Sequence, residues 1–472
     1  MRPIPNFAMK SLRGWTIGLV TIGLMGWLLL PSRPLLANQA AAAGPSPDLP
    51  AGKAAYEENC VRCHGPSGKG DGPDARHMVP RPRLLADGVY KFRTTASGTP
   101  PTDEDLFQTI STGLPGSQMP SFERLPEETR WQLAYYVKSL SSALEGQTPE
   151  RLDMGSDPGV KKVDFKRGKE LYAQLGCGSC HGNLGRGNGP SAATLTDNWS
   201  NPIRPVDLTH GWSYRAGSTP KQIVARVMTG IDGSPMPSYA DALSSKEDAW
   251  ILAYYVHYLQ VPPRWSRTVE AVKVSGELPL APYDHPWQDA PRTDLRLSSI
   301  VYQQGEIQPT TVTSVSVQAV YNEEAILFRL TWHDPTEDRA TPPDAVCLAL
   351  EPDRYLKTRL GSLRSWPADP ETPALDLCFW SADKDTGRES ILKEMDTLNQ
   401  AMEPGQLLES HSFFEDGEWT LLVKRPFDSQ LAGRKKLEPQ RPILFGVTVW
   451  NGGNGEQGRR RANSNWVDLI LK

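Results

Sequence analysis

Apolar residues recur at helical spacing in two similar segments of the chain. These are Trp131–Val137 and Trp250–Val256, and both read Trp-x-Leu-Ala-Tyr-Tyr-Val. Because side chains three and four residues apart share one face of a helix, each segment predicts a helix with a buried face. Shorter helical runs precede them, near Lys53–Asn59 and Arg167–Leu175. The pattern therefore predicts two helical units, each opened and closed by a helix.

The last third of the chain changes to an alternation of apolar and polar residues. Val315–Tyr321 and Ile326–Trp332 alternate on either side of Asn322–Glu324, which is typical of a β-hairpin. Lys384–Glu409 is less regular and is compatible with a helix. The other strand candidates are Ala345–Leu350, Ala374–Trp380, Glu418–Lys424 and Ile443–Trp450. The expected fold class is therefore multidomain, with two all-α units followed by a mainly-β sandwich.

The two helical units are copies of one sequence. The matched motif residues lie 117 positions apart and are Cys60, Cys63 and His64 in the first unit and Cys177, Cys180 and His181 in the second. The same shift pairs Met119 with Met236, each in a glycine-rich loop 55 residues beyond the motif histidine. Between these fixed points the loops differ in length. This is the pattern of one domain fold used twice.

Both cysteine motifs read Cys-x-x-Cys-His, the attachment signal of c-type haem. The two thiols can form thioethers to the two vinyl groups of one porphyrin, and the adjacent histidine then lies under the iron. A zinc site needs four ligands, and each motif supplies only three nearby. One such motif at the equivalent position of each repeated unit is not accidental, so we predict two covalently bound haems c.

Met119 and Met236 are the candidates for the sixth iron ligand, because they are the methionines that the repeat pairs and each precedes a proline. A thioether ligand raises the potential of haem iron relative to a second histidine. The alternative is that both methionines only pack against the haem edge. With His64 and Met119 on one iron, and His181 and Met236 on the other, neither iron has an open position, which favours electron transfer over catalysis.

The N-terminal segment has the features of an export signal. Basic residues precede the uncharged run Trp15–Leu30, and small residues follow at Ala37–Ala43. We predict a signal peptide at residues 1–43, with an uncleaved membrane anchor as the alternative. The remainder is then periplasmic or on the outer face of the cytoplasmic membrane. The formal net charge of −4 gives no support to a nucleic-acid partner.

Two of the six cysteines, Cys347 and Cys378, lie outside the motifs in apolar, strand-like runs. An exported protein can form a disulfide between them. Two buried thiols are equally compatible with the sequence.

Both helical units resemble class I cytochrome c domains, over residues 48–145 and 158–262. The resemblance rests on the motif, the methionine loop and the Tyr-Tyr-Val helix. It implies a small all-helical fold around the haem, in which the first and last helices cross. Arg81 and Arg204 lie where a haem propionate could be paired, although a solvated loop arginine explains them equally well.

Residues 285–472 resemble the haem-binding gamma subunit of ethylbenzene dehydrogenase and its relatives among the molybdenum enzymes of the dimethyl sulfoxide reductase group. The matching segments are Trp332–Arg339, Asp344–Leu348, Asp416–Pro426, Val449–Gly452 and Gly458–Trp466. In that family the domain holds a b-type haem between a methionine and a lysine.

The residues at those two ligand positions differ in this chain, where Lys357–Gly361 and Arg459–Arg461 stand instead. Arginine keeps its proton at accessible pH and cannot bind iron. The remaining methionines of the region are Met395 and Met402, in the irregular stretch. This favours a domain that has lost its b haem.

Two classes of function follow. The first is an electron-transfer subunit, not itself an enzyme, of an exported molybdenum oxidoreductase complex. Its partners would be the catalytic and iron–sulfur subunits of the complex, and a soluble electron carrier or terminal oxidase. Relatives of the resembled family act on several substrates, and a complex similar to a nitrite oxidoreductase is one possibility. The second is a dihaem cytochrome with a carbohydrate- or protein-binding sandwich. The tryptophans that could line a sugar platform, or simply fill the core, are Trp287, Trp366, Trp380 and Trp419.

Overall fold

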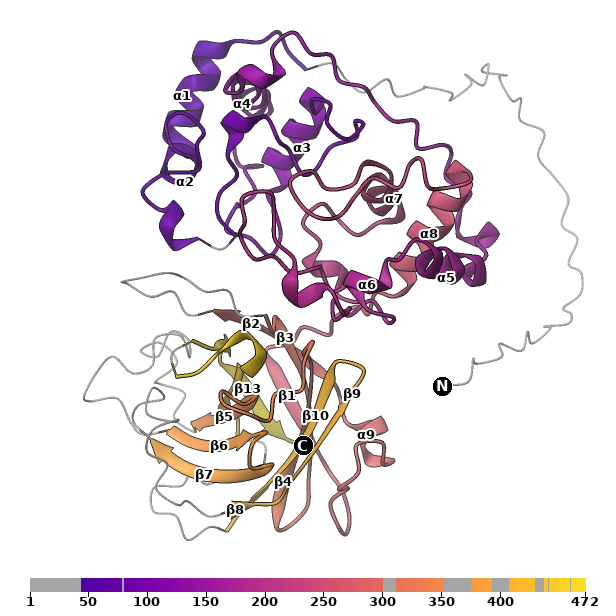
Figure 1. Ribbon diagram of the computed structural model, residues 1–472. Coiled ribbons are helices and arrows are strands. Elements are labelled where there is room, and N and C mark those ends of the chain that lie inside the picture. The colour runs from indigo at the N-terminus through magenta and orange to yellow at the C-terminus, as the bar shows by residue number, and fades with distance from the viewer. Residues whose placement is uncertain are drawn as a thin grey trace, which may run out of the picture. The chain divides into compact units, whose positions relative to one another are not determined.

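The computed structural model describes residues 44–78, 80–299, 311–351, 375–392, 407–428, 437–439, 441–458 and 460–472 (Figure 1). The predicted signal at residues 1–43 lies outside this range, as do Lys357–Gly361, Arg459, Met395 and Met402. Within the described ranges, no helix combines the length and the apolar character that crossing a membrane requires.

The first helical unit contains α1 (Leu49–Asn59), α2 (Val61–His64), α3 (Asp103–Thr112) and α4 (Glu127–Ser139). Asp48 caps α1, and Thr102 forms a capping box at the start of α3, so both helices begin where a side chain satisfies free backbone N–H groups. α1 packs against α4 at Gly52, where a Cβ would lie 2.3 Å from the carbonyl oxygen of Gln132. A glycine is needed for this close crossing.

The second unit repeats this arrangement with α5 (Phe165–Gln174), α6 (Gly178–His181), α7 (Pro220–Thr229) and α8 (Lys246–Tyr258). Thr219 forms the matching capping box. α5 meets α8 at Gly168, where a Cβ would lie 2.6 Å from Cβ of Tyr255. The opening and closing helices predicted from the apolar pattern are confirmed in both units. Short 3-10 turns lie at Ala75–His77, Leu85–Asp87, Ser142–Leu144, Val160–Lys162, Ala192–Thr194, Gly211–Ser213 and Gly452–Asn454.

The described strands of the C-terminal region form one hydrogen-bonded sheet. Its strands are β1 (Thr268–Lys273), β2 (Thr293–Ser299), β3 (Ser314–Tyr321), β4 (Ala325–His333), β5 (Ala345–Glu351), β6 (Leu375–Ser381), β7 (Thr386–Leu392), β8 (Leu407–Leu408), β9 (Ser410–Glu415), β10 (Glu418–Pro426), β11 (Ile443–Trp450), β12 (Ala462–Ser464) and β13 (Val467–Leu471). A short helix, α9 (Pro286–Asp289), precedes β2.

The strands follow the order β8-β7-β6-β5-β11-β12-β2-β3-β4-β10-β9, and β1 pairs in parallel with β13 and β3. The predicted hairpin is β3–β4, with Tyr321 opposite Ile326. Part of the stretch that was compatible with a helix is instead the strand β7, which pairs along its whole length with β6. Pairing with a neighbour has overridden a weak local pattern there.

A core of large aromatic side chains joins distant strands of the sheet. Trp332 of β4 lies 6.4 Å from Trp380 of β6 between ring centroids, and Phe328 of β4 stacks on Phe445 of β11 at 5.3 Å. All four side chains are buried in one cluster. The sheet therefore buries one face of β4 against β6 and β11.

Cys347 and Cys378 lie on the paired strands β5 and β6 but form no disulfide. Their registers differ by one residue, because Cys347 stands opposite Phe379 and Cys378 opposite Leu348. Successive side chains of a strand point to opposite faces, so the two sulfur atoms belong to different apolar clusters. Of the two alternatives that the sequence left open, the structure has the buried, unbridged thiols.

Candidate functional site

The first Cys-x-x-Cys-His motif lies on the turn from α1 into α2. The backbone N–H of His64 donates to the carbonyl of Cys60 at 2.9 Å, which places the histidine one helical turn after the first cysteine. Its ring atom Nδ1 lies 3.0 Å from the carbonyl oxygen of Arg83. Because that oxygen only accepts hydrogen bonds, Nδ1 carries the proton and Nε2 keeps its lone pair for a metal. Burial lowers the pKa of His64, so the ring is neutral.

The second motif has the same geometry. Nδ1 of His181 lies 3.0 Å from the carbonyl oxygen of Val206, and burial lowers the pKa of this ring as well. A tyrosine about one turn before each motif holds the glycine that comes directly after the motif histidine. The hydroxyl of Tyr56 donates to the carbonyl of Gly65 and that of Tyr172 to the carbonyl of Gly182, both at 2.8 Å. Two separate copies of the motif thus present the same ring nitrogen.

The first cysteine of each motif is a protonated thiol at neutral pH. Burial raises the pKa of Cys60 to about 12 and that of Cys177 to about 11. A thioether carries no charge, so covalent attachment to an apolar porphyrin suits the same environment.

Met119 and Met236 lie in equivalent loops, each between the third and fourth helix of its unit. The N–H of Leu114 donates to the carbonyl of Met119 at 3.1 Å, and that of Ile231 to Met236 at 3.0 Å. Both methionine side chains are half-buried. Met119 packs against the same apolar core as Cys60. Motif and methionine thus border one apolar core in the first unit, while coordination by either methionine stays a prediction.

A glycine makes each methionine loop possible. Gly230 has φ 66° and ψ −167°, a backbone region that is essentially restricted to glycine, and a Cβ there would lie 2.6 Å from the carbonyl carbon of Pro237. Replacing Gly230 with alanine should therefore lower the free energy of unfolding by about 1–3 kcal/mol, measured by urea denaturation. Gly146 also has a positive φ but has no atoms within 4 Å of its Cβ position. Equal losses in Gly230→Ala and Gly146→Ala would contradict this account of the loop.

Half-buried cations from both units meet near the motifs, and sequence reasoning missed them. The guanidinium carbon of Arg83 lies 4.3 Å from the ring centroid of Trp199 in the second unit. Burial, reinforced by Arg83 and Arg215, lowers the pKa of Lys91 to about 8, and burial also lowers the pKa of Arg215. Arg81 and Arg204 are exposed instead. A group of half-buried cations is suited to the carboxylates of a bound cofactor.

Ion pairs and hydrogen bonds hold the two helical units together around these cations. Arg93 is fully buried; it pairs with Asp232 at 2.8 Å and donates to the carbonyl of Thr229 at 3.1 Å. Ser97 donates to the same Asp232 carboxylate at 2.7 Å. Arg226 donates back to the carbonyl of Arg93. Asp232 begins the turn that leads to Met236, so this contact fixes the second methionine loop from the first unit.

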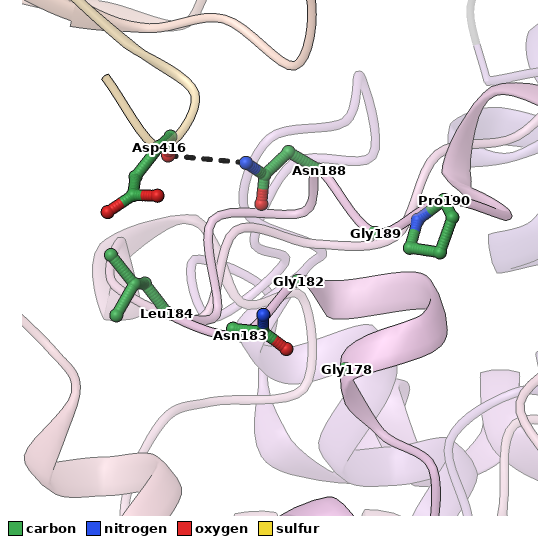
Figure 2. A pocket seen from close by; sticks show the side chains of 8 residues that line it. All are labelled: Gly178, Gly182, Asn183, Leu184, Asn188, Gly189, Pro190 and Asp416. Carbon is green, nitrogen blue, oxygen red and sulfur yellow. Dashed lines mark hydrogen bonds between the residues drawn. The ribbon is translucent and has the colours of Figure 1, made fainter.

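The second unit also contacts the sheet. Figure 2 shows the pocket beside the second motif, where the side-chain amide of Asn188 donates to the carbonyl of Asp416 at 3.2 Å. Nearby, Nδ1 of His333 on β4 lies 2.5 Å from Asp207, the residue after Val206. Nε2 of His333 lies 3.1 Å from Glu418. The sheet therefore contacts the loop that holds His181.

Two family models match the helical units. The model described as Cytochrome c matches residues 50–141. The model described as Cytochrome C oxidase, cbb3-type, subunit III, matches residues 163–256.

The chain is also similar to subunits of respiratory complexes. A putative respiratory nitrate reductase heme subunit, ORF7, of Haloferax mediterranei is 24% identical over 205 residues, which cover 42% of this chain and 70% of that protein. The cbb3-type cytochrome c oxidase subunit FixP of Azorhizobium caulinodans is 27% identical over 209 residues, 44% of this chain and 58% of that protein. The chain thus spans little more than half the length of the second relative.

Among solved structures, the chain is similar to the Kuenenia stuttgartiensis reducing HAO-like protein complex Kustc0457/Kustc0458. The identity is 42%, the match covers 45% of this chain and 96% of that chain, and the TM-score is 0.42.

Proposed function

We propose, from the two cytochrome c domains that the chain contains, that this dihaem electron-transfer protein is a subunit of an exported molybdenum oxidoreductase complex. One observation carries the electron-transfer role. In both domains Nδ1 of the motif histidine is held by a backbone carbonyl, which leaves Nε2 for iron. The proposed axial pairs are His64 with Met119 and His181 with Met236.

The residues of both domains fit covalent haem c. Cys60 and Cys63 would attach one haem, and Cys177 and Cys180 the other. When bound, each haem supplies a one-electron iron couple. The chain itself fixes the ring of each histidine. Met119 and Met236 would supply a thioether ligand to each iron, and the half-buried cations Arg83, Lys91 and Arg215 would offset the charge of the haem carboxylates.

The molybdenum partner rests on the resemblance of residues 285–472 to the ethylbenzene dehydrogenase gamma subunit. The nitrate reductase heme subunit among the relatives supports a respiratory complex of this kind. An iron–sulfur subunit and a molybdenum-containing subunit should co-purify with the native protein. A lone monomer at every concentration and salt condition would contradict this assignment.

We further propose that the C-terminal domain binds no b haem. Arg461 occupies the last position of the arginine run before Ser464-x-Trp466, and its side chain is fully buried. Arginine cannot bind iron. The carbohydrate-binding alternative gains no support from the described tryptophans, because Trp287, Trp380 and Trp419 are buried in the core. Trp366, the fourth candidate, lies outside the described residues.

A pyridine haemochrome spectrum of the purified protein should show two haems c and no haem b per chain. A Cys177→Ala, Cys180→Ala variant should retain one haem c, since the first motif is independent of the second. The matched control is Cys347→Ala, which should retain both haems because this thiol lies in the sheet. One additional, extractable b haem would show that the C-terminal domain has kept its cofactor.

A further inference from the structure

Three aspartates meet at the end of β4, away from the haem motifs. They are Asp334, which follows β4 directly, Asp338, in the loop to β5, and Asp344, which precedes β5. One carboxylate oxygen from each lies within 4.8 Å of the others. Asp334 and Asp344 are fully buried, and Asp338 is half-buried. Three like charges this close and this far from water need a counter-charge.

One oxygen of this cluster lacks a partner. Oδ1 of Asp334 accepts hydrogen bonds from the side-chain amide of Asn451 at 2.8 Å and from the N–H of Thr336 at 3.2 Å. Oδ2 of the same buried carboxylate has no hydrogen-bond partner. A buried acceptor left unsatisfied costs free energy unless a cation or a proton binds it.

Backbone and indole N–H groups hold the carboxylate of Asp344, and the carboxylate of Asp338 accepts a hydrogen bond from the hydroxyl of Thr336 at 2.5 Å. Asp344 accepts hydrogen bonds from the N–H of Gly452 at 2.8 Å, that of Asp338 at 2.9 Å and the indole of Trp419 at 3.0 Å. Such bonds stabilise the ionised form of the carboxylate.

No basic side chain of the described residues is ion-paired with these three carboxylates. Arg339, the basic residue nearest in sequence, pairs with Glu337 at 2.7 Å and Asp385 at 3.6 Å. We infer that Asp334, Asp338 and Asp344 form a binding site for a calcium ion. The site lies outside both cytochrome c domains and does not depend on the function proposed above.

The surroundings favour calcium over magnesium. A Cβ at Gly453 would lie 2.4 Å from the hydroxyl of Thr336 and 2.6 Å from a carboxylate oxygen of Asp338, and one at Gly452 would lie 2.2 Å from the carbonyl of Pro342. The two glycines thus let the chain close tightly over the cluster. Magnesium retains several waters in a strict octahedron, whereas calcium accepts irregular sets of protein oxygens.

The test is thermal unfolding of the full-length protein after chelation and dialysis, with and without millimolar Ca²⁺. Calcium should raise Tm by roughly 5 °C or more in the native protein, because it binds only the folded state. Asp334→Asn and Asp338→Asn should abolish the shift. Asp289→Asn, which changes an exposed aspartate far along the sequence, should keep it. Metal analysis after equilibrium dialysis should give one Ca²⁺ per chain, lost in Asp334→Asn.

Two outcomes would overturn the proposal. The first is a Tm that does not respond to Ca²⁺ while Asp334→Asn is more stable than the native protein, since the carboxylates would then share a proton. The second is an equal response to Mg²⁺ and Ca²⁺, which would remove the assignment of calcium. Asp338→Asn provides the second variant because Asp338 is half-buried and its substitution disturbs the fold least.

Discussion

Replacing Met236 with histidine should lower the midpoint potential of one haem by a few tenths of a volt, within the ~0.8 V that axial ligands span. A thioether favours ferrous iron more than an imidazole does, so the substitution stabilises the oxidised form. The other haem should keep its potential, because Met119 lies in a separate loop of the other domain. A spectroelectrochemical titration of the purified protein measures both potentials.

The matched variant Met119→His should lower the midpoint potential of the haem in the first domain and leave that of the haem in the second domain unchanged. Met154→Leu is the control, since this methionine packs against the core of the second domain without a counterpart in the repeat. Unchanged potentials in both histidine variants would mean that Met119 and Met236 only pack against the haem edge. Loss of the methionine-to-iron absorbance band would separate ligation from a change in packing.

Most of the correct predictions depend on the spacing of residues that are close together in the sequence. The helices α1, α4, α5 and α8 follow from apolar residues three and four apart, and the β3–β4 hairpin follows from alternation. The haem motifs depend on five consecutive residues each, so no tertiary contact is needed to find them. The strand β7 was not predicted, because its apolar and polar residues alternate only weakly and the strand depends on its pairing with β6.

The parts that sequence reasoning missed are contacts between residues far apart in the chain. Arg83 was overlooked in favour of Arg81, although its position becomes distinctive only through its approach to Trp199, more than a hundred residues later. The aspartate cluster was visible as conspicuous residues of a family motif, but not as one site. Its members converge only when β4, β5 and the turn after β11 lie side by side.

Replacing His333 with glutamine should lower the free energy of unfolding by about 3 kcal/mol near pH 6. The side chain is 18% exposed and binds Asp207 at 2.5 Å and Glu418 at 3.1 Å. Burial alone would lower the pKa of His333, but the hydrogen bonds to both carboxylates outweigh it and raise this pKa to about 9. The imidazolium is therefore favoured by folding. Urea denaturation of both proteins measures the difference.

The effect should disappear in alkali. The pKa of His333 is higher in the folded protein than the usual value of about 6.5, so its contribution is complete below that pH and is lost as the pH rises through about 9. The titration of Asp207 determines the lower pH limit of this stability difference. Although burial opposes ionisation of this carboxyl, His333 lowers its pKa to about 2, so its contribution is complete above about pH 4 and is lost as the pH falls through 2. The difference between native protein and variant should thus be largest between about pH 4 and 6.5.

His411→Gln is the control for this charge effect, because His411 is 43% exposed and lies 3.8 Å from Glu409. It should change stability by less than about 1 kcal/mol at any pH. A loss in His333→Gln that is the same at about pH 6 and pH 10 would mean that the ring acts through packing rather than through its charge. The distinction matters for electron transfer, since Asp207 follows the carbonyl that holds His181. A charged His333 on the sheet then helps to fix the loop that holds His181, the residue proposed as proximal ligand of the second haem.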